Sequence, residues 1–261
     1  MVRPVTITLL FFVAWAAPAA AELRYITHVE ARKLPSDAPV DPLLGVLGSM
    51  LMNFMASGDT TTIIGMSSVR VETKNAVGPV PAGSAVLLRM GSALVLNAQD
   101  QTYWPLPEIP GGTLAKMDPQ MTSTRTGQFA MVAGLRAERM TYTVTLNLPL
   151  PPNFQLPLPR TLTMDGEMWV ADEYKQYASA FAAVTPIAVP GISTGLFGGG
   201  SPEGLVVRQI TRSALLGFEV EYNVSDIVEG PVPADLLQIP AGYREIARPT
   251  ATPTLPPPPA R

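Results

Sequence analysis

The sequence predicts a mainly β (α+β) protein in which roughly eight to ten strands form one curved antiparallel sheet or incomplete barrel. Apolar and polar residues alternate with period two in several runs, which is typical of strands with one buried face. Short polar turns separate these runs, and strands joined in this way pair as antiparallel meanders. The 28 prolines cluster in connecting segments and in the C-terminal tail, which argues against a helical bundle.

The N-terminal residues 1–21 have the features of a secretory signal peptide. Arg3 precedes an apolar run over residues 5–15, and small residues stand at Ala19 and Ala21. A membrane anchor is the alternative, but this run is too short to span a bilayer core, which takes about 20 residues. We therefore expect cleavage after Ala21 and a periplasmic or secreted protein.

Composition limits the classes open to the mature chain. The chain has no cysteine, which excludes both a lipid on an N-terminal cysteine and a disulfide framework. Cleavage removes Arg3, so the mature chain keeps 17 of the 18 basic residues and all 21 acidic ones, which gives a formal charge of −4. It has no basic stretch suited to binding nucleic acid. With 47% apolar residues, residues 22–246 can form one domain with a substantial core.

The strand runs begin directly after the predicted cleavage site. In residues 22–33, Leu23, Tyr25, Thr27 and Val29 share one face, while charged residues and His28 occupy the other. Comparable runs cover residues 60–73, 84–90, 93–98, 101–106, 133–146, 160–170, 204–212 and 216–227.

A first helix is predicted over residues 42–57. Asp41 suits the N-cap, Pro42 the first helical position and Gly58 the end. The segment carries no charge and is apolar almost all round, so it must be buried or lie against lipid or ligand. Small residues at Gly45 and Gly48 would allow close approach of backbone or ligand.

A second helix is predicted to follow the strand at 160–170, with Asp172 as its cap. Tyr174, Tyr177 and Phe181 stand at helical spacing, while the opposite side of the helix is polar. We expect this aromatic stripe to pack on the sheet.

Three segments read as connections rather than regular structure. Residues 147–160 are predicted to form a long proline-rich loop, and residues 195–204 a flexible glycine-rich linker. Residues 247–261 are predicted to be a disordered tail, either solvated without a partner or in contact with the cell wall or a proline-binding protein.

The stretch before this tail, residues 234–246, is predicted to be a closing latch. Pro240 restricts φ and Gly242 permits a positive φ, so Tyr243 can turn back onto the sheet while Arg244 stays in water. A binding role for Tyr243 and Arg244 is the alternative.

Several of these stretches resemble an uncharacterised family of bacterial envelope proteins. The resemblance rests on GEMWVADEYKQYA at 166–178, LGFEVEYNVSDIVEG at 216–230 and LLQIPAGYREI at 236–246, with ALVLNAQDQTYWPLP at 93–107 similar to that family's central hairpin. The family is related in fold to the LolA-type lipoprotein carriers. The resemblance implies a LolA-like half-barrel over residues 22–246, wrapped around one or two helices and enclosing an apolar cavity. The 42–57 helix, the proline-rich loop and the tail depart from the family pattern, and the basic residues that a lipoprotein carrier uses to meet its partners have no clear match.

Residues suited to catalysis are few. His28 is the only histidine, so a Ser-His-Asp triad would have to use it as the general base, and a zinc site of several histidines is excluded. Two carboxylate pairs, Asp165 with Glu167 and Asp172 with Glu173, have the composition of a glycosidase pair, but turns and caps explain them more simply. We therefore expect no enzyme, no cofactor and no metal.

The sequence thus favours a non-enzymatic envelope protein that binds or shields a hydrophobic ligand, such as a lipid, an acyl chain or a lipoprotein-like partner. The alternative is an envelope scaffold that meets partner proteins and whose helices fill the barrel. An open apolar pocket would favour the first and a close-packed interior the second. The candidate ligand-binding residues are Met50, Met52, Phe54, Met55, Trp104, Trp169, Tyr174 and Phe181.

Overall fold

The computed structural model describes residues 22–34, 44–45, 48, 58–76, 80–89, 92–106, 120–147, 160–180 and 204–247. The predicted signal peptide, most of the apolar helix, nearly all of the proline-rich loop, most of the glycine-rich linker and nearly all of the tail lie outside these residues. Among the residues described, no helix is long and apolar enough to cross a membrane.

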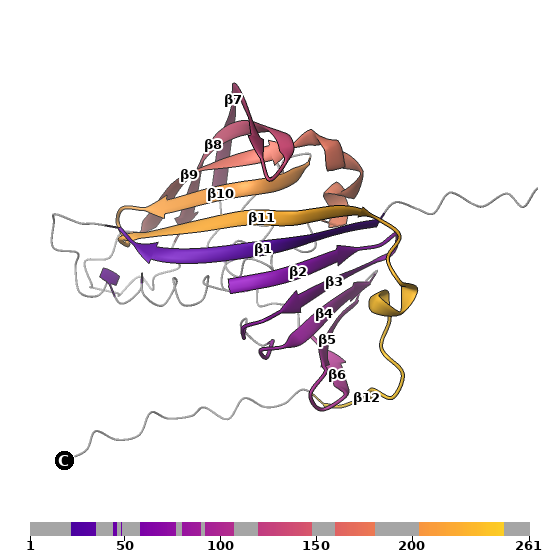
Figure 1. Cartoon of the computed structure of the whole chain (residues 1–261). Helices are drawn as coiled ribbons and strands as arrows, with labels where there is room; N and C mark the ends of the chain where they lie inside the picture. Colours follow the sequence, from indigo (N-terminus) through magenta and orange to yellow (C-terminus); the bar gives the residue numbers. More distant parts are fainter. Residues whose placement is uncertain are drawn as a thin grey trace, which may run out of the picture.

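The described chain forms one sheet of twelve strands (Figure 1). Two short 3-10 helices, η1 (Asp172–Tyr177) and η2 (Ala234–Leu237), accompany it. The strands are β1 (Glu22–Lys33), β2 (Gly58–Ile64), β3 (Ser68–Thr73), β4 (Ser84–Arg89), β5 (Ser92–Asn97), β6 (Thr102–Pro105), β7 (Gln120–Val132), β8 (Leu135–Asn147), β9 (Thr161–Ala171), β10 (Leu205–Ser213), β11 (Phe218–Gly230) and β12 (Arg244–Glu245).

The strand order is β12-β6-β5-β4-β3-β2-β1-β11-β10-β9-β8-β7. Strands β1 to β6 form one meander and β7 to β11 a second, and the two join where β1 pairs with β11. Figure 1 shows the sheet bent, with β1 and β11 in the middle and the two meanders curving away on either side. The predicted fold class, a strongly curved and mainly antiparallel half-barrel, is confirmed.

The strand count was predicted too low, for three reasons. The run at 60–73 contains a turn, closed by a hydrogen bond from Gly65 N to Ser68 O, and therefore supplies two strands. Strand β7 is exposed along nearly its whole length, so it lacks the apolar alternation that would reveal it. Strand β12 is only two residues long and pairs with β6 in parallel, which corrects the expectation of an all-antiparallel sheet.

One face of the sheet supplies the main core. Side chains alternate across a strand, and the register aligns the buried ones into ladders that cross both meanders. One ladder runs through Tyr25, Thr62, Val71, Val86, Val95 and Trp104. We call this side of the sheet the inner face, because the buried residues of both meanders belong to one cluster on it.

The start of the predicted apolar helix lies against this inner face. Leu44, Gly45 and Gly48 have helical conformation, and Leu44 is buried within the main core. A side chain at Gly48 would collide with the backbone of Leu216, in the turn between β10 and β11. The predicted close approach is therefore confirmed at Gly48, whereas a Cβ at Gly45 would meet no atom of the described residues within 4 Å.

The second predicted helix differs in type and in its cap. Residues 172–177 form the 3-10 helix η1, and only residues 178–180 continue as α-helix. The prediction that Asp172 caps it is wrong: β9 extends through Ala171, which takes the N-cap position without a side-chain hydrogen bond. Asp172 instead forms an ion pair of 3.4 Å with Lys175.

The C-terminal stretch closes over the outer face of the sheet, opposite the main core. Ile239 and Tyr243 pack on a second cluster formed by Ala85, Leu87 and Leu96. Gly242 has φ +88°, and the backbone beyond it pairs with β6 as β12.

Two arginines attach η2 to the sheet. Arg70 Nη1 donates to Leu236 O at 3.2 Å, and Arg89 Nη2 donates to Leu237 O at 3.2 Å. The predicted latch is thus present, with Arg244 exposed as expected.

Candidate functional site

The inner face of β1 to β6 is the candidate ligand-binding face. In the described parts of these strands, its inward positions carry one charged side chain, Lys33 at the end of β1. Near the ends of the strands, however, polar residues replace the apolar ones. They align across all six strands as Thr27, Thr60, Thr73, Ser84, Asn97 and Thr102, which we call the polar row.

Four hydroxyls on this face lack a hydrogen-bond partner among the described residues: Thr27 Oγ1, Thr60 Oγ1, Thr62 Oγ1 and Ser84 Oγ. The exposed fractions of these residues are only 0%, 1%, 0% and 2%. Leaving a buried polar group unsatisfied costs about 1–3 kcal/mol. Four such groups are a large cost beside a net folding stability of about 5–15 kcal/mol, so their presence calls for an explanation.

Two of the four hydroxyls lie beside buried tyrosines. Burial raises the pKa of Tyr222 to about 12, and the neighbouring Thr27 hydroxyl acts in the opposite direction. Burial also raises the pKa of Tyr25 well above its usual value; Tyr222 adds to this rise, and the Thr62 hydroxyl opposes it. Thr27 and Thr62 act on these pKa values as hydrogen-bond partners of the two phenols, so they are not isolated even though they lack well-formed hydrogen bonds. Thr60 and Ser84 are the more isolated pair.

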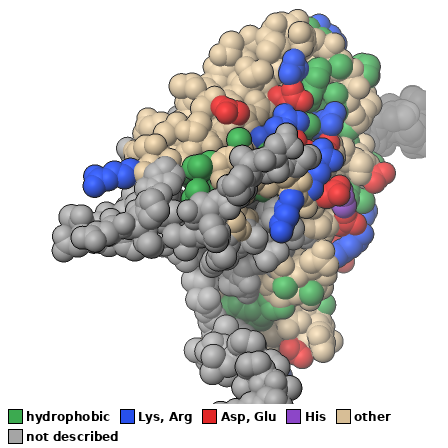
Figure 2. Space-filling model, turned by 90° about the vertical axis from the view of Figure 1, so that its left-hand side faces the viewer, with side chains coloured by type: hydrophobic (Ala, Val, Ile, Leu, Met, Phe, Trp, Pro, Cys, Tyr) green, Lys and Arg blue, Asp and Glu red, His purple; other side chains and the backbone are tan. Residues whose placement is uncertain are grey.

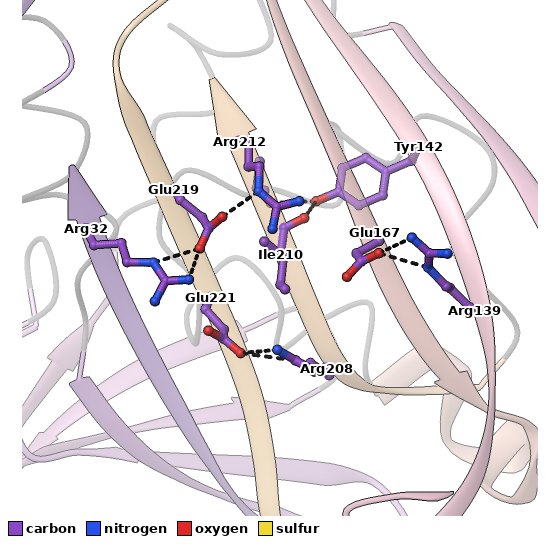
Figure 3. Close-up of polar contacts among 10 residues, drawn as sticks. Arg32, Arg139, Tyr142, Glu167, Arg208, Ile210, Arg212, Glu219 and Glu221 are labelled. Atoms are coloured by element: carbon purple, nitrogen blue, oxygen red, sulfur yellow. Dashed lines mark hydrogen bonds and ion pairs between the residues drawn. The ribbon is translucent and has the colours of Figure 1, made fainter. Parts of the chain in front are cut away.

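The other half of the inner face contains a polar cluster that is fully satisfied. Gln209 Nε2 donates to Tyr142 Oη at 2.8 Å, and Tyr142 Oη lies 2.5 Å from Thr211 Oγ1. Tyr142 also donates to Ile210 O at 3.3 Å (Figure 3). This arrangement requires Gly166, because a Cβ there would lie 2.5 Å from the Tyr142 hydroxyl. Burial raises the pKa of Tyr142 to about 12, although the hydrogen bonds to Thr211 and Gln209 oppose the rise.

The structure places the two tryptophans of the predicted site on opposite faces. Trp104 is 2% exposed and ends the inner ladder that includes Thr62. Trp169 stands between the buried Met168 and Val170 in β9, and therefore points to the outer face. Trp169 is nevertheless partly buried and packs against the main core cluster that contains Trp104, so the two indoles differ in strand phase but both adjoin that core.

The remaining predicted site residues are divided. Tyr174 is partly buried beside Tyr177, with ring centroids 6.3 Å apart, in η1 and thus in the other half of the fold from Trp104. Met50, Met52, Phe54, Met55 and Phe181 lie outside the described residues.

The outer face carries paired charges instead of a polar site. Arg32 and Arg212 both bind Glu219, and Arg208 binds Glu221 (Figure 3). Figure 2 shows acidic and basic side chains interspersed on the surface rather than gathered by sign. Such pairs are structural features of a solvated sheet face and give no patch for a strongly charged partner.

The residues considered for catalysis have structural partners on this face. His28 Nδ1 lies 2.6 Å from Asp59 Oδ1. Asp165 accepts a hydrogen bond from Thr143 Oγ1 at 2.6 Å, and Glu167 accepts one from Arg139, as Figure 3 shows. The described residues contain no group of three acidic or histidine side chains that could hold a metal ion.

Sequence reasoning missed the polar row, although one signal for it was present. Thr27 occupies an apolar phase in the alternation of Leu23, Tyr25 and Val29. Its partners across the sheet lie tens of residues away, so only the register brings them together.

Comparison with known proteins gives matches at the level of structure alone. No family model and no curated protein sequence matches the chain. An uncharacterized conserved protein from Thermus thermophilus is 6% identical, with a TM-score of 0.39 and coverage of 88% of this chain and 91% of that one. A putative outer membrane lipoprotein-sorting protein domain from Vibrio parahaemolyticus is 10% identical, with a TM-score of 0.29 and coverage of 83% and 88%.

A DUF1329 family protein from Desulfovibrio piger is 5% identical, with a TM-score of 0.32 and coverage of 85% and 90%. With TM-scores this low, function has to be argued from the residues of the chain itself. The chain is thus similar to a putative lipoprotein-sorting domain and to a DUF1329 family protein.

Proposed function

We propose that the protein binds a lipid or acyl chain on the inner face of β1 to β6 and performs no catalysis. The observation that carries the proposal is a mainly apolar inner face, charged only at Lys33 at the end of β1, on which buried hydroxyls lack partners among the described residues. Ligand sites for small molecules have this composition, an apolar lining with a few polar groups that orient the ligand. With the predicted cleavage after Ala21, the protein would act in the periplasm or outside the cell.

The predicted apolar helix belongs to the proposed site. Leu44, at its start, packs in the main core of the inner face, which supports contact of the following segment with the same ligand. The methionines predicted there, at 50, 52 and 55, have flexible and polarizable side chains that adapt to chains of different shape. Phe54 and Phe181 would extend the apolar contact.

A scaffold with a filled interior is the second candidate, favoured by the burial of Leu44 within the same core as the inner face. Mass spectrometry of lipids extracted from natively purified protein separates the two functions. Ligand binding predicts a lipid that copurifies in a fixed molar ratio. A scaffold predicts no bound lipid.

Tryptophan fluorescence tests which face binds. After removal of residues 1–21, Trp104 and Trp169 are the only tryptophans. Addition of oleate or its methyl ester to delipidated protein is expected to shift the emission of the Trp169→Phe variant, in which Trp104 remains. The Trp104→Phe variant, which retains only Trp169 at the outward phase of β9, is expected to show a smaller shift. A shift confined to Trp104→Phe would contradict binding on the inner face.

A further inference from the structure

We infer that the polar row selects the neutral carbonyl of an ester-linked or amide-linked acyl chain and discriminates against a free fatty-acid anion. The inference rests on the proposed function and names the ligand class for the same face. Three observations carry it: the alignment of the unpartnered hydroxyls, their place on the sheet and the absence of charge around them in the described strands.

The hydroxyls lie along one line on the inner face, where Thr60 and Ser84 stand two strands apart and would contact different polar atoms of a ligand. Thr27 and Thr60 are direct cross-strand partners, and Thr60 pairs in turn with Thr73. Directly opposed residues on one sheet face stand about 5 Å apart. Thr73 already donates to the carbonyl oxygen of Pro81 or of Ser84, and Thr27 adjoins the Tyr222 phenol, so Thr60 and Ser84 supply the uncommitted hydroxyl protons. Each of them requires an acceptor atom, such as a carbonyl oxygen.

The position of the row gives the ligand a direction. The row lies near the margin of the sheet where β2 begins, β3 ends and β4 begins. The ladder beside the row contains the Thr62 hydroxyl but becomes apolar at Val71, Val86 and Val95. The ladder after that is apolar at Leu23, Ile64 and Val69. A ligand with its polar group at the margin and its chain along the strands matches this change from polar to apolar surface.

The charges around the row favour a neutral polar group. In the described parts of β1 to β6, charged side chains occupy outward positions except for Lys33, which ends β1 six residues beyond Thr27. Among the outward ones, Asp59 is paired with His28 at 2.6 Å and with Lys74 at 2.7 Å. The ion pair of Arg125 and Glu138 belongs to β7 and β8, at the other end of the strand order. A carboxylate at the row would thus be buried without a cation, whereas a neutral carbonyl needs only the hydroxyl protons.

Methyl oleate and oleate differ only at this polar group and therefore form the matched probes. Delipidated protein is titrated with each at pH 8, where oleate is ionised, and binding is followed by tryptophan emission. We expect the methyl ester to bind at least about tenfold more tightly than oleate, since burial of an unpaired carboxylate is costly. Thr60→Val and Ser84→Ala are each expected to weaken binding of the ester about fivefold, the loss of one hydrogen bond.

Thr61→Val is the matched control, because Thr61 lies in the same strand and points to the outer face. It should leave the affinity for methyl oleate unchanged. The inference is overturned if the wild-type protein binds oleate as tightly as methyl oleate or more tightly. It is also overturned if Thr60→Val and Ser84→Ala leave the affinity for methyl oleate unchanged, which is the result expected if only water occupies the polar row. In both cases the proposed function stands. Failure of both probes to bind overturns the proposed function as well. The comparison of methyl oleate with oleate uses the wild-type protein alone. It therefore tests the inference even if one of the substitutions prevents folding.

Discussion

Two buried threonines on the inner face should respond with opposite sign to the same substitution. Thr60 Oγ1 has no hydrogen-bond partner among the described residues, whereas Thr211 Oγ1 lies 2.5 Å from Tyr142 Oη and accepts from Gln209 Nε2 at 3.3 Å. Valine has nearly the shape of threonine, so each substitution exchanges a hydroxyl for a methyl group at little steric cost. The sign of the effect then depends on whether the hydroxyl is satisfied.

The expected magnitudes follow from these contacts. Thr60→Val removes a buried, unsatisfied hydroxyl and should raise the free energy of unfolding by about 1 kcal/mol. Thr211→Val removes hydrogen bonds to Tyr142 and Gln209 and should lower it by about 1–2 kcal/mol. In a chain of this size, 1 kcal/mol corresponds to a shift of about 2–4 °C in the thermal midpoint.

Urea unfolding of delipidated protein, followed by fluorescence and circular dichroism, measures both changes. Thr61→Val, on the outer face of the same strand as Thr60, is expected to stay within about 0.5 kcal/mol of wild type. If Thr60→Val destabilises the protein as much as Thr211→Val, the Thr60 hydroxyl has a partner, such as bound water. The account of the polar row would then be wrong.

Two further predictions concern the latch and the outer face. Gly242 has φ +88°, so Gly242→Val should lower the free energy of unfolding by a few kcal/mol through backbone strain. Truncation after Ile246 should leave the thermal midpoint nearly unchanged. Equal effects of the two changes on the thermal midpoint would mean that the turn does not stabilise the latch. Burial alone would raise the pKa of the Glu219 carboxyl, but hydrogen bonds from two arginines lower it below its ordinary value. Its contribution to stability is therefore present above the unfolded-state pKa and lost as the pH falls through the folded-state pKa. Between about pH 5 and 3 the wild type should lose stability more steeply than Glu219→Gln, and parallel unfolding curves for the two would refute this reasoning.

The local pattern was sufficient for elements whose burial repeats along the chain. Alternation in residues 22–33 predicted β1, because one face of this strand packs on the core and the other meets water. Strand β7 could not be found in this way, since its residues are mostly exposed and it exists through backbone pairing with β8. The cap prediction at Asp172 failed because β9 continues to Ala171 before the chain turns.

The candidate site shows the same division. Composition and periodicity indicated an apolar interior and placed Trp104 in a strand. They did not show that Trp104 lies within the main core while Trp169, at the opposite strand phase, packs against it. The latch residues were read correctly as a turn, because Pro240 and Gly242 act through their own backbone preferences. Its place on the outer face depends on Arg70 and Arg89, which are more than 140 residues away in the chain.

By itself, the sequence determined the mainly β class, most of the strands and the conformation of the C-terminal turn, because each of these depends on residues within a few positions of one another. Tertiary structure decided which strands pair, and hence that Thr27, Thr60 and Ser84 meet in one row. A shift of one residue in the register of any of these strands would send its hydroxyl to the opposite face, so the row is a property of strand pairing and of no single segment.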